Sequence, residues 1–237
     1  MVSLRNALSS GFGAAPAGWP QIEWMGANTT VFMAVEMGAK AGIFLADHAT
    51  RSYLSTRVVE PVRPVEPDTD ARYAREIVID LSELGPQIAR PHEPDNVVAL
   101  HEASGTRVDM VFVGTCTGGR VSDFHEVLAQ IEDGGGIAPG VILVLTPASR
   151  EVHLELLRDG TLATLTALGA VITTPGCGAC CGTSGMIPGD GMTVVSTANR
   201  NFKARMGNAT ASIYLASPAS CGVAAATGML TGPRVRV

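Results

Sequence analysis

Residues 109–147 read DMVFVGTCTGGRVSDFHEVLAQIEDGGGIAPGVILVLTP, and the order of element types within this stretch decides the fold. Residues 109–113 form an apolar run that ends at Gly114, which predicts a strand. Residues 122–131 carry apolar side chains at helical spacing. Residues 141–145 are again continuously apolar, as expected for a strand buried on both faces. A strand, a helix and a second strand joined by short turns predict a parallel sheet flanked by helices.

The same alternation continues towards the end of the chain. A helix is predicted over residues 149–157, with Ser149 as its N-cap, and a helix of small residues over 218–229. The expected fold is therefore α/β, with mostly parallel, helix-flanked sheets in two adjacent subdomains. In such sheets, ligands bind beyond the carboxyl ends of the strands. The remaining predicted strands of this region are residues 171–174, 193–196 and 213–216.

The composition changes near residue 90, which predicts a first subdomain over 1–92 and a second over 93–237. Within the first, residues 59–70 are rich in proline and should form a loop, because proline prevents a regular element. Residues 76–81 alternate well enough to form a strand. The first 19 residues read as an irregular lead-in rather than as a transit peptide, since they contain a single arginine.

The overall charge excludes several classes of protein. The chain has 237 residues, and its charges sum as 17 − 22 = −5. An acidic chain of this kind is not expected to bind nucleic acid or an anionic membrane, because both require a basic surface. No stretch approaches the roughly 20 apolar residues that span a bilayer. Five clustered cysteines argue against a disulfide framework and for a reducing, cytoplasmic location.

Three cysteines follow two of the predicted strands. Cys177 and Cys180 come directly after the strand at 171–174, and Cys116 comes directly after the strand at 109–113. If these strands are parallel neighbours, their carboxyl ends bring the three sulfurs to one edge of the sheet. Glycines surround all three, so backbone amides can approach the sulfurs closely. Three thiolates without an evident fourth ligand favour an iron–sulfur cluster with one iron left free to bind substrate.

Two other interpretations of these cysteines stay open. A C-x-x-C pair can be a redox pair of the thioredoxin kind. A tetrahedral zinc site needs four ligands, and His125 could supply the fourth. Cys181 and Cys221 are interpreted as buried residues without a chemical role, since small apolar neighbours surround Cys221.

Residues 199–205, with the sequence NRNFKAR, follow the predicted strand at 193–196 and should lie at the same edge as the cysteines. The guanidinium groups of Arg200 and Arg205 suit bidentate binding of carboxylates, and Asn199 adds an amide. A basic turn that only faces solvent is the alternative.

Glu36 lies in an otherwise apolar stretch of the first subdomain. A carboxylate in such a stretch lies either on a helix surface or buried near a site. Taken without other information, the surface position is favoured.

Taken together, these motifs resemble the aconitase superfamily, and most closely the large subunit of isopropylmalate isomerase and homoaconitase. The resemblance spans nearly the whole chain from about Ile22. Four motifs carry it in the family's order: AVEMGAKAG at 34–42, GTCT at 114–117 with Arg120, PGCGAC at 175–180, and STANRNF at 196–202 followed by Arg205 and then Ser217 and Pro218.

The resemblance implies a role for each matching residue. Cys116, Cys177 and Cys180 would ligate a four-iron, four-sulfur (4Fe-4S) cluster, whose free iron acts as a Lewis acid on the substrate hydroxyl and carboxylate. Glu36 would lie near the hydroxyl or water exchanged at that iron. The implied reaction is the reversible loss and re-addition of water on a hydroxy-polycarboxylate, similar to isopropylmalate or homocitrate. The substrate carboxylates would be held by Asn199, Arg200 and Arg205.

Several positions depart from the family's pattern. Phe32 stands where the family has an asparagine, and Gly118 stands where it has the asparagine of Cys-Thr-Asn. Ala148 and Ala204 each replace a glycine of the family. The cluster ligands are intact, so these changes bear on the choice of substrate.

The resemblance also implies partner chains. A further lobe of the family's large subunit, which supplies catalytic aspartate and histidine residues, has no counterpart in this sequence. Neither does the swivelling lobe, which is often a separate small subunit. We therefore expect a component of a heteromeric hydro-lyase that acts with separate chains carrying these lobes. The alternatives are a scaffold or binding subunit that retains the fold without catalysis, and a zinc or thiol-redox module.

Overall fold

The computed structural model describes residues 2–3, 45–60, 63, 66–73, 75–76 and 85–232. The chain divides into two compact units, Met1–Leu84 and Gly85–Val237, which are described separately. Among the residues that the structure describes, no helix is both long and apolar enough to cross a bilayer.

In the first unit, two short strands and one helix are described. β1 (Val2–Ser3) pairs in parallel with β2 (Arg75–Glu76). Helix α3 (His48–Ser55) begins after Asp47, whose carboxylate accepts a hydrogen bond from the amide of Thr50 at 2.7 Å. A side-chain acceptor of this kind satisfies one of the free amides at a helix start.

Several sequence predictions fall on this unit. The described residues of the proline-rich stretch 59–70 form neither helix nor strand, as predicted. Glu76, the first residue of the predicted strand 76–81, lies in β2, and the rest of that strand lies outside the described residues. Glu36 also lies outside them.

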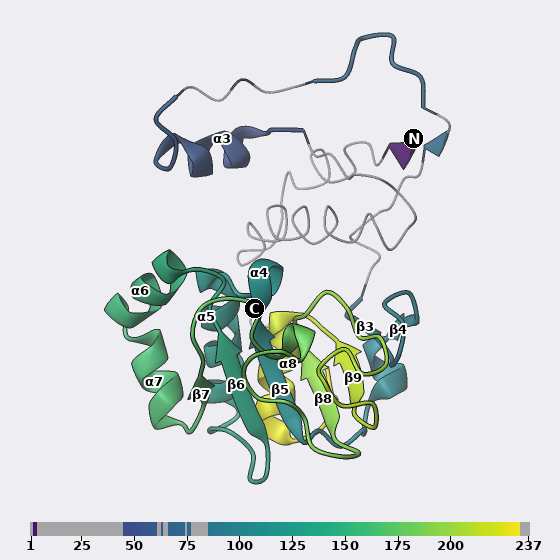
Figure 1. Ribbon diagram of the computed structural model, residues 1–237, viewed down its shortest axis with the longest axis vertical. Helices are drawn as coiled ribbons and strands as arrows, with labels where there is room; N and C mark the ends of the chain where they lie inside the picture. The colour runs from purple at the N-terminus through teal and green to yellow at the C-terminus, as the bar shows by residue number, and fades with distance from the viewer. Residues whose placement is uncertain are drawn as a thin grey trace. The chain divides into compact units, whose positions relative to one another are not determined.

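The second unit is built on one seven-stranded sheet with the order β4-β3-β9-β8-β5-β6-β7. The five strands from β9 to β7 are parallel, and β3 runs antiparallel to both β4 and β9. Figure 1 shows β5 and β6 near the middle of this unit, with α6 and α7 beyond β7. The observed architecture confirms the predicted α/β fold. The strands are β3 (Gln87–Ala89), β4 (Val97–Ala99), β5 (Met110–Gly114), β6 (Ile142–Thr146), β7 (Val171–Ile172), β8 (Thr193–Ser196) and β9 (Ser212–Leu215).

The helices of this unit begin where the sequence supplies capping residues. Helix α6 has Ser149 as its N-cap, as predicted, and the Ser149 hydroxyl accepts a hydrogen bond from the amide of Val152 at 3.3 Å. Ser217 caps α8 in the same way, with Pro218 in the first turn. The helices are α4 (Thr115–Gly118), α5 (Val121–Asp133), α6 (Arg150–Arg158), α7 (Thr161–Ala167) and α8 (Pro218–Thr227), with 3₁₀ turns η2 (Leu100–Ala103) and η3 (Gly178–Cys181).

Strand β5 separates two hydrophobic cores. Val111 and Val113 point into a core that includes residues of α5 and α8. Met110 and Phe112 point to the other face, where the core includes residues of the loops after β7 and β8. All five residues of β5 are buried, because alternate side chains of a strand point to opposite faces and both faces are covered.

Two details differ from the sequence predictions. Residues 85–92, assigned above to the first subdomain, lie in the second unit, because β3 hydrogen-bonds to β9. The strands that precede the cysteines are also not neighbours: β6 lies between β5 and β7. One strand therefore separates β5 from β7, but because β5, β6 and β7 are parallel, their carboxyl ends still share one edge of the sheet.

Candidate iron–sulfur site

The turn after β5 carries Cys116 and depends on an unusual backbone. Gly114 has a φ of 155° and Thr115 a φ of 85°, and α4 starts at once, with Cys116 exposed. A side chain at Gly114 would collide with the carbonyl oxygen of Thr146 at the end of β6. Glycine is therefore required for the ends of β5 and β6 to approach this closely.

The loop after β7 carries the other two thiols. Cys177 is exposed, whereas Cys180 is 7% exposed and packs in the second core. Gly178 between them has a φ of 54°, and a side chain there would collide with the hydroxyl of Thr146. Thr146 is thus the point on β6 against which both cysteine loops pack.

The three thiols share one electrostatic environment. Burial raises the pKa of the Cys180 thiol, and the charges of Cys177 and Cys116 act in the same direction. Arg205 opposes them, since its Nη2 lies 4.0 Å from the Cys180 sulfur. A cation beside a buried sulfur stabilises its thiolate, which is the form that binds metal.

The donor set consists of three thiols, the ligand type that iron–sulfur clusters and zinc both take. All three thiols are free, and they lie on two glycine-rich loops at one sheet edge. Within the part of the chain that the structure describes, no group of three or more His, Cys, Asp or Glu side chains is arranged to hold one metal ion. In a cluster each thiolate binds a different iron, so the sulfurs stand further apart than the ligands of one zinc.

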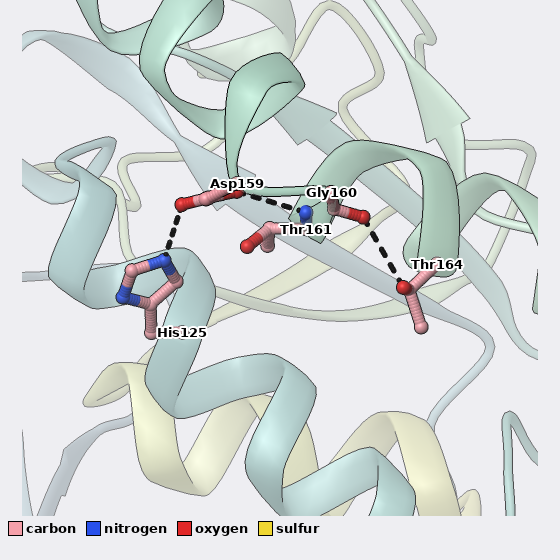
Figure 2. A network of polar contacts seen from close by, with 5 residues as sticks. All are labelled: His125, Asp159, Gly160, Thr161 and Thr164. Atoms are coloured by element: carbon pink, nitrogen blue, oxygen red, sulfur yellow. Dashed lines mark hydrogen bonds and ion pairs between the residues drawn. The ribbon is translucent and has the colours of Figure 1, made fainter.

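His125, the suggested fourth zinc ligand, is engaged elsewhere. On α5, its Nε2 lies 2.8 Å from Oδ2 of Asp159, and Oδ1 of the same carboxylate accepts a hydrogen bond from the amide of Thr161 at 2.9 Å (Figure 2). Burial raises the pKa of Asp159, but the bonds from Thr161 and His125 outweigh it and lower the pKa. Thr164 bonds to the carbonyl of Gly160 at 3.1 Å. This network joins α5 to the α6–α7 turn, so His125 has a structural partner.

The segment after β8 reaches the same edge of the sheet as the cysteines. Arg200 is half-buried, and Arg205 combines its contact with Cys180 with a buried Nε that has no hydrogen-bond partner among the described residues. A guanidinium with an unused buried donor can accept an anion. Ala204, just before Arg205, has a φ of 65°, the left-handed conformation that favours glycine.

The side chains of the two asparagines in this segment form hydrogen bonds within the protein. Asn199 is 7% exposed, and its side-chain oxygen accepts a hydrogen bond from the hydroxyl of Thr117. Asn201 is completely buried and donates to the carbonyls of Arg90 at 2.8 Å and Ile213 at 3.2 Å. Asn201 therefore ties the segment to β9 and to the end of β3.

Threonine hydroxyls between these turns were missed by sequence reasoning. The Thr197 hydroxyl accepts from the amide of Gly114 at 3.0 Å and lies 3.0 Å from the carbonyl of Gly118. The hydroxyls of Thr146 and Thr173 lie 2.5 Å apart across β6 and β7. The available signal was a threonine at or just after the end of four strands, β5 to β8.

The remaining cysteines differ from each other. Cys221 is completely buried, in agreement with the prediction, and burial raises the pKa of its thiol. Cys181 is half-buried, and its thiol lies 2.9 Å from the hydroxyl of Thr183, a bond that lowers the thiol pKa. The expectation of a plain buried residue is therefore wrong for Cys181.

Comparison with known proteins decides the family. The model of the aconitase family (aconitate hydratase) matches residues 17–106 and 101–228 of this chain. The chain belongs to the aconitase family. Within that family, it is 45% identical over 202 residues to a 3-isopropylmalate dehydratase large subunit of Methanopyrus kandleri, which covers 85% of this chain and 48% of that protein.

Two further members of the aconitase family are similarly close. A probable methanogen homoaconitase large subunit of Methanosarcina mazei is 46% identical over 88% of this chain and 52% of that protein. A homoaconitase large subunit of Thermus thermophilus is 45% identical over 86% of this chain and 48% of that protein. The chain spans about half the length of the curated relatives it matches.

Proposed function

We propose that the chain is the iron–sulfur component of an aconitase-type hydro-lyase, with Cys116, Cys177 and Cys180 as the ligands of a 4Fe-4S cluster. The observation that carries the proposal is the convergence of three free thiols, with Arg205 beside Cys180, at one edge of the sheet. When bound, the cluster would supply a Lewis-acidic iron without a protein ligand.

The substrate is proposed to be a hydroxy-polycarboxylate of the isopropylmalate or homocitrate class, as the names of the relatives suggest. Arg200 and Arg205 would bind its carboxylates, with Asn199 beside them. The unused Nε of Arg205 supports this role, because a buried guanidinium donor gains a strong hydrogen bond from a carboxylate. Glu36 is proposed to lie near the hydroxyl that leaves as water.

Partner chains are part of the proposal. The relatives are named as large subunits, and this chain matches about half of their length. We propose that a chain carrying the other half and a separate small subunit complete the enzyme. The free state of all five cysteines agrees with a reducing, cytoplasmic location.

The cluster is tested by anaerobic reconstitution with iron and sulfide, followed by metal and sulfide analysis and absorption spectroscopy. The wild-type chain should bind about four irons with matching sulfide and become brown. Cys116→Ser and Cys177→Ser should lose the colour. Cys181→Ser is the matched control and should keep it. A wild-type chain that stays colourless and iron-free would contradict the proposal.

The same experiment separates the alternatives. A zinc module would bind one zinc without sulfide, and His125→Gln would lower its zinc content. A scaffold subunit would assemble with the partner chains but catalyse nothing. Hydration of an unsaturated dicarboxylate or tricarboxylate by the reconstituted assembly, measured by loss of alkene absorbance, supports the hydro-lyase. Assembly with a loaded cluster and no hydration of any such acid favours the scaffold.

A further inference from the structure

One buried hydroxyl links the turn that carries Cys116 to the turn that carries Arg200. Thr117 is 1% exposed, and its hydroxyl donates a hydrogen bond to the side-chain oxygen of Asn199. Each partner is next in sequence to a residue of the proposed site. The bond is therefore a direct side-chain connection between the two turns.

Thr117 also makes contacts within its own turn, with Thr115. The amide of Thr117 donates to the hydroxyl of Thr115 at 3.4 Å, and the two hydroxyls lie 3.5 Å apart. Thr115 holds a φ of 85°, which a β-branched residue rarely adopts, and it is 1% exposed. A strained backbone of this kind persists only where surrounding contacts over-determine it.

A second connection runs through the backbone. The Thr197 hydroxyl bonds to Gly114 and Gly118, the residues at the two ends of the α4 turn. Thr197 thus fixes the ends of this turn, whereas the Thr117–Asn199 bond holds the residue that follows Cys116 in sequence. The two turns then move as one body rather than independently.

We propose that Thr117 is a positioning residue that couples the place of the Cys116 thiol to the place of the Arg200 guanidinium. Asn199 is its acceptor, so the Asn199 side-chain oxygen already accepts one bond from the protein, and its amide nitrogen can donate to a substrate carboxylate. The functional meaning rests on the proposed cluster and carboxylate site, but the coupling is a property of the metal-free chain.

The coupling is tested by amide hydrogen exchange on the full metal-free chain. In Thr117→Val, which keeps the shape and removes the hydroxyl, exchange should rise in both segments 114–119 and 197–201. We expect a rise on the order of five- to tenfold, the factor that one hydrogen bond contributes. Thr117→Ser should restore protection. Thr164→Val, which loses only a bond to a helix carbonyl on α7, should leave both segments unchanged.

A variant of the acceptor, Asn199, tests the same hydrogen bond from its other end. Asn199→Ala should loosen the same two segments, and the double variant should add little to either single one. A rise confined to segment 114–119 in Thr117→Val would overturn the inference, since a local packing defect would explain it. Should Thr117→Val fail to fold, Thr117→Ala and Asn199→Ala provide the same comparison.

A second readout follows reconstitution with iron and sulfide. Thr117→Val should bind the wild-type amount of iron but show a shifted cluster spectrum or reduction potential, and Thr117→Ser should return to the wild-type value. Absence of any shift would contradict a positioning role. A wild-type chain that binds no iron would contradict the proposed function alone, because the exchange experiment needs no metal.

Discussion

Ala204 holds a backbone conformation that costs an alanine more than a glycine. Its φ is 65°, and the next residue is Arg205. A residue with a Cβ loses roughly 1–2 kcal/mol in this region. Glycine would relieve that strain but would lose about 0.4–1 kcal/mol of stability by giving the unfolded chain more freedom. Ala204→Gly should therefore raise the free energy of unfolding by about 0.5–1 kcal/mol, measured by urea denaturation.

The control for Ala204→Gly is the same chemical change in a helix. Ala163 is exposed on α7, so Ala163→Gly should destabilise the chain by about 0.5–1 kcal/mol. Equal losses for the two variants would show that Ala204 carries no backbone strain.

Asp123 is the residue whose ionisation should set the pH dependence of stability. It is completely buried, with Oδ2 accepting from the amide of Arg120 at 2.8 Å and Oδ1 without a hydrogen-bond partner among the described residues. Burial raises the pKa of Asp123 from 3.8 to about 7, and the charge of Glu126 adds to this, while the bonded amide and the charge of Arg120 oppose it. The charge of Asp123 in turn adds to the raised pKa of the buried Cys221 thiol on α8.

The direction of the effect follows from the raised pKa. Between pH 3.8 and about 7, Asp123 is protonated when folded and ionised when unfolded. The free energy of unfolding should therefore fall as pH rises through this window, by up to about 1.4 kcal/mol per pH unit, and level off above it. Asp123→Asn keeps the acceptor for Arg120 and should reduce this slope in denaturation curves, and the part that remains is expected from Glu126, whose pKa is also raised by burial. Glu132→Gln, which removes an exposed carboxylate of α5, should retain it.

At the scale of elements, the contact between α5 and α8 leaves no room for a side chain at position 222. A Cβ at Gly222 would lie 2.8 Å from both the carbonyl oxygen of Val127 and the Cβ of Gln130. The backbone carbonyl of Val127 cannot move aside as the end of a flexible side chain can, so α5 and α8 would have to move apart. Gly222→Ala should lower the free energy of unfolding by roughly 1–3 kcal/mol. Gly232→Ala, where the new methyl meets nothing within 4 Å, should change it little.

The elements that the sequence predicted share a property. The strands β5, β6 and β8 have apolar residues at consecutive central positions, and their positions agree with the prediction to within one residue. In contrast, β3 and β4 were missed, because they are three residues long and lie among prolines that mark the surrounding loop. Helix α7 was missed as well, since its threonines give weak helical propensity.

The candidate site shows the same limit. The cysteines and arginines are visible in the sequence because each follows a strand. The order of the strands in the sheet cannot be seen in the sequence, because periodicity indicates which residues are buried but not which strands are neighbours. The insertion of β6 between β5 and β7, and the pairing of Thr117 with Asn199, could therefore come only from the structure.

At the scale of the whole molecule, the second unit contains its own core. The two hydrophobic cores are drawn from residues between Ile88 and Leu230, and the seven-stranded sheet lies in the same range. A fragment of residues 85–237 should therefore fold by itself and unfold in one cooperative urea transition. A fragment that is digested as rapidly as an unfolded chain in limited proteolysis would contradict this.

The place of β7 in the sheet divides the proposed ligands unequally. Cys116 follows β5, which has a strand on each side, whereas Cys177 and Cys180 follow β7, a two-residue strand at the border of the sheet. Terminal strands open at lower energy than central ones. Loss of a cluster held by these proposed ligands would then release the β7 loop first and leave the Cys116 turn in place. Reassembly of such a cluster would then require only that the β7 loop return to the Cys116 turn, without refolding of the sheet.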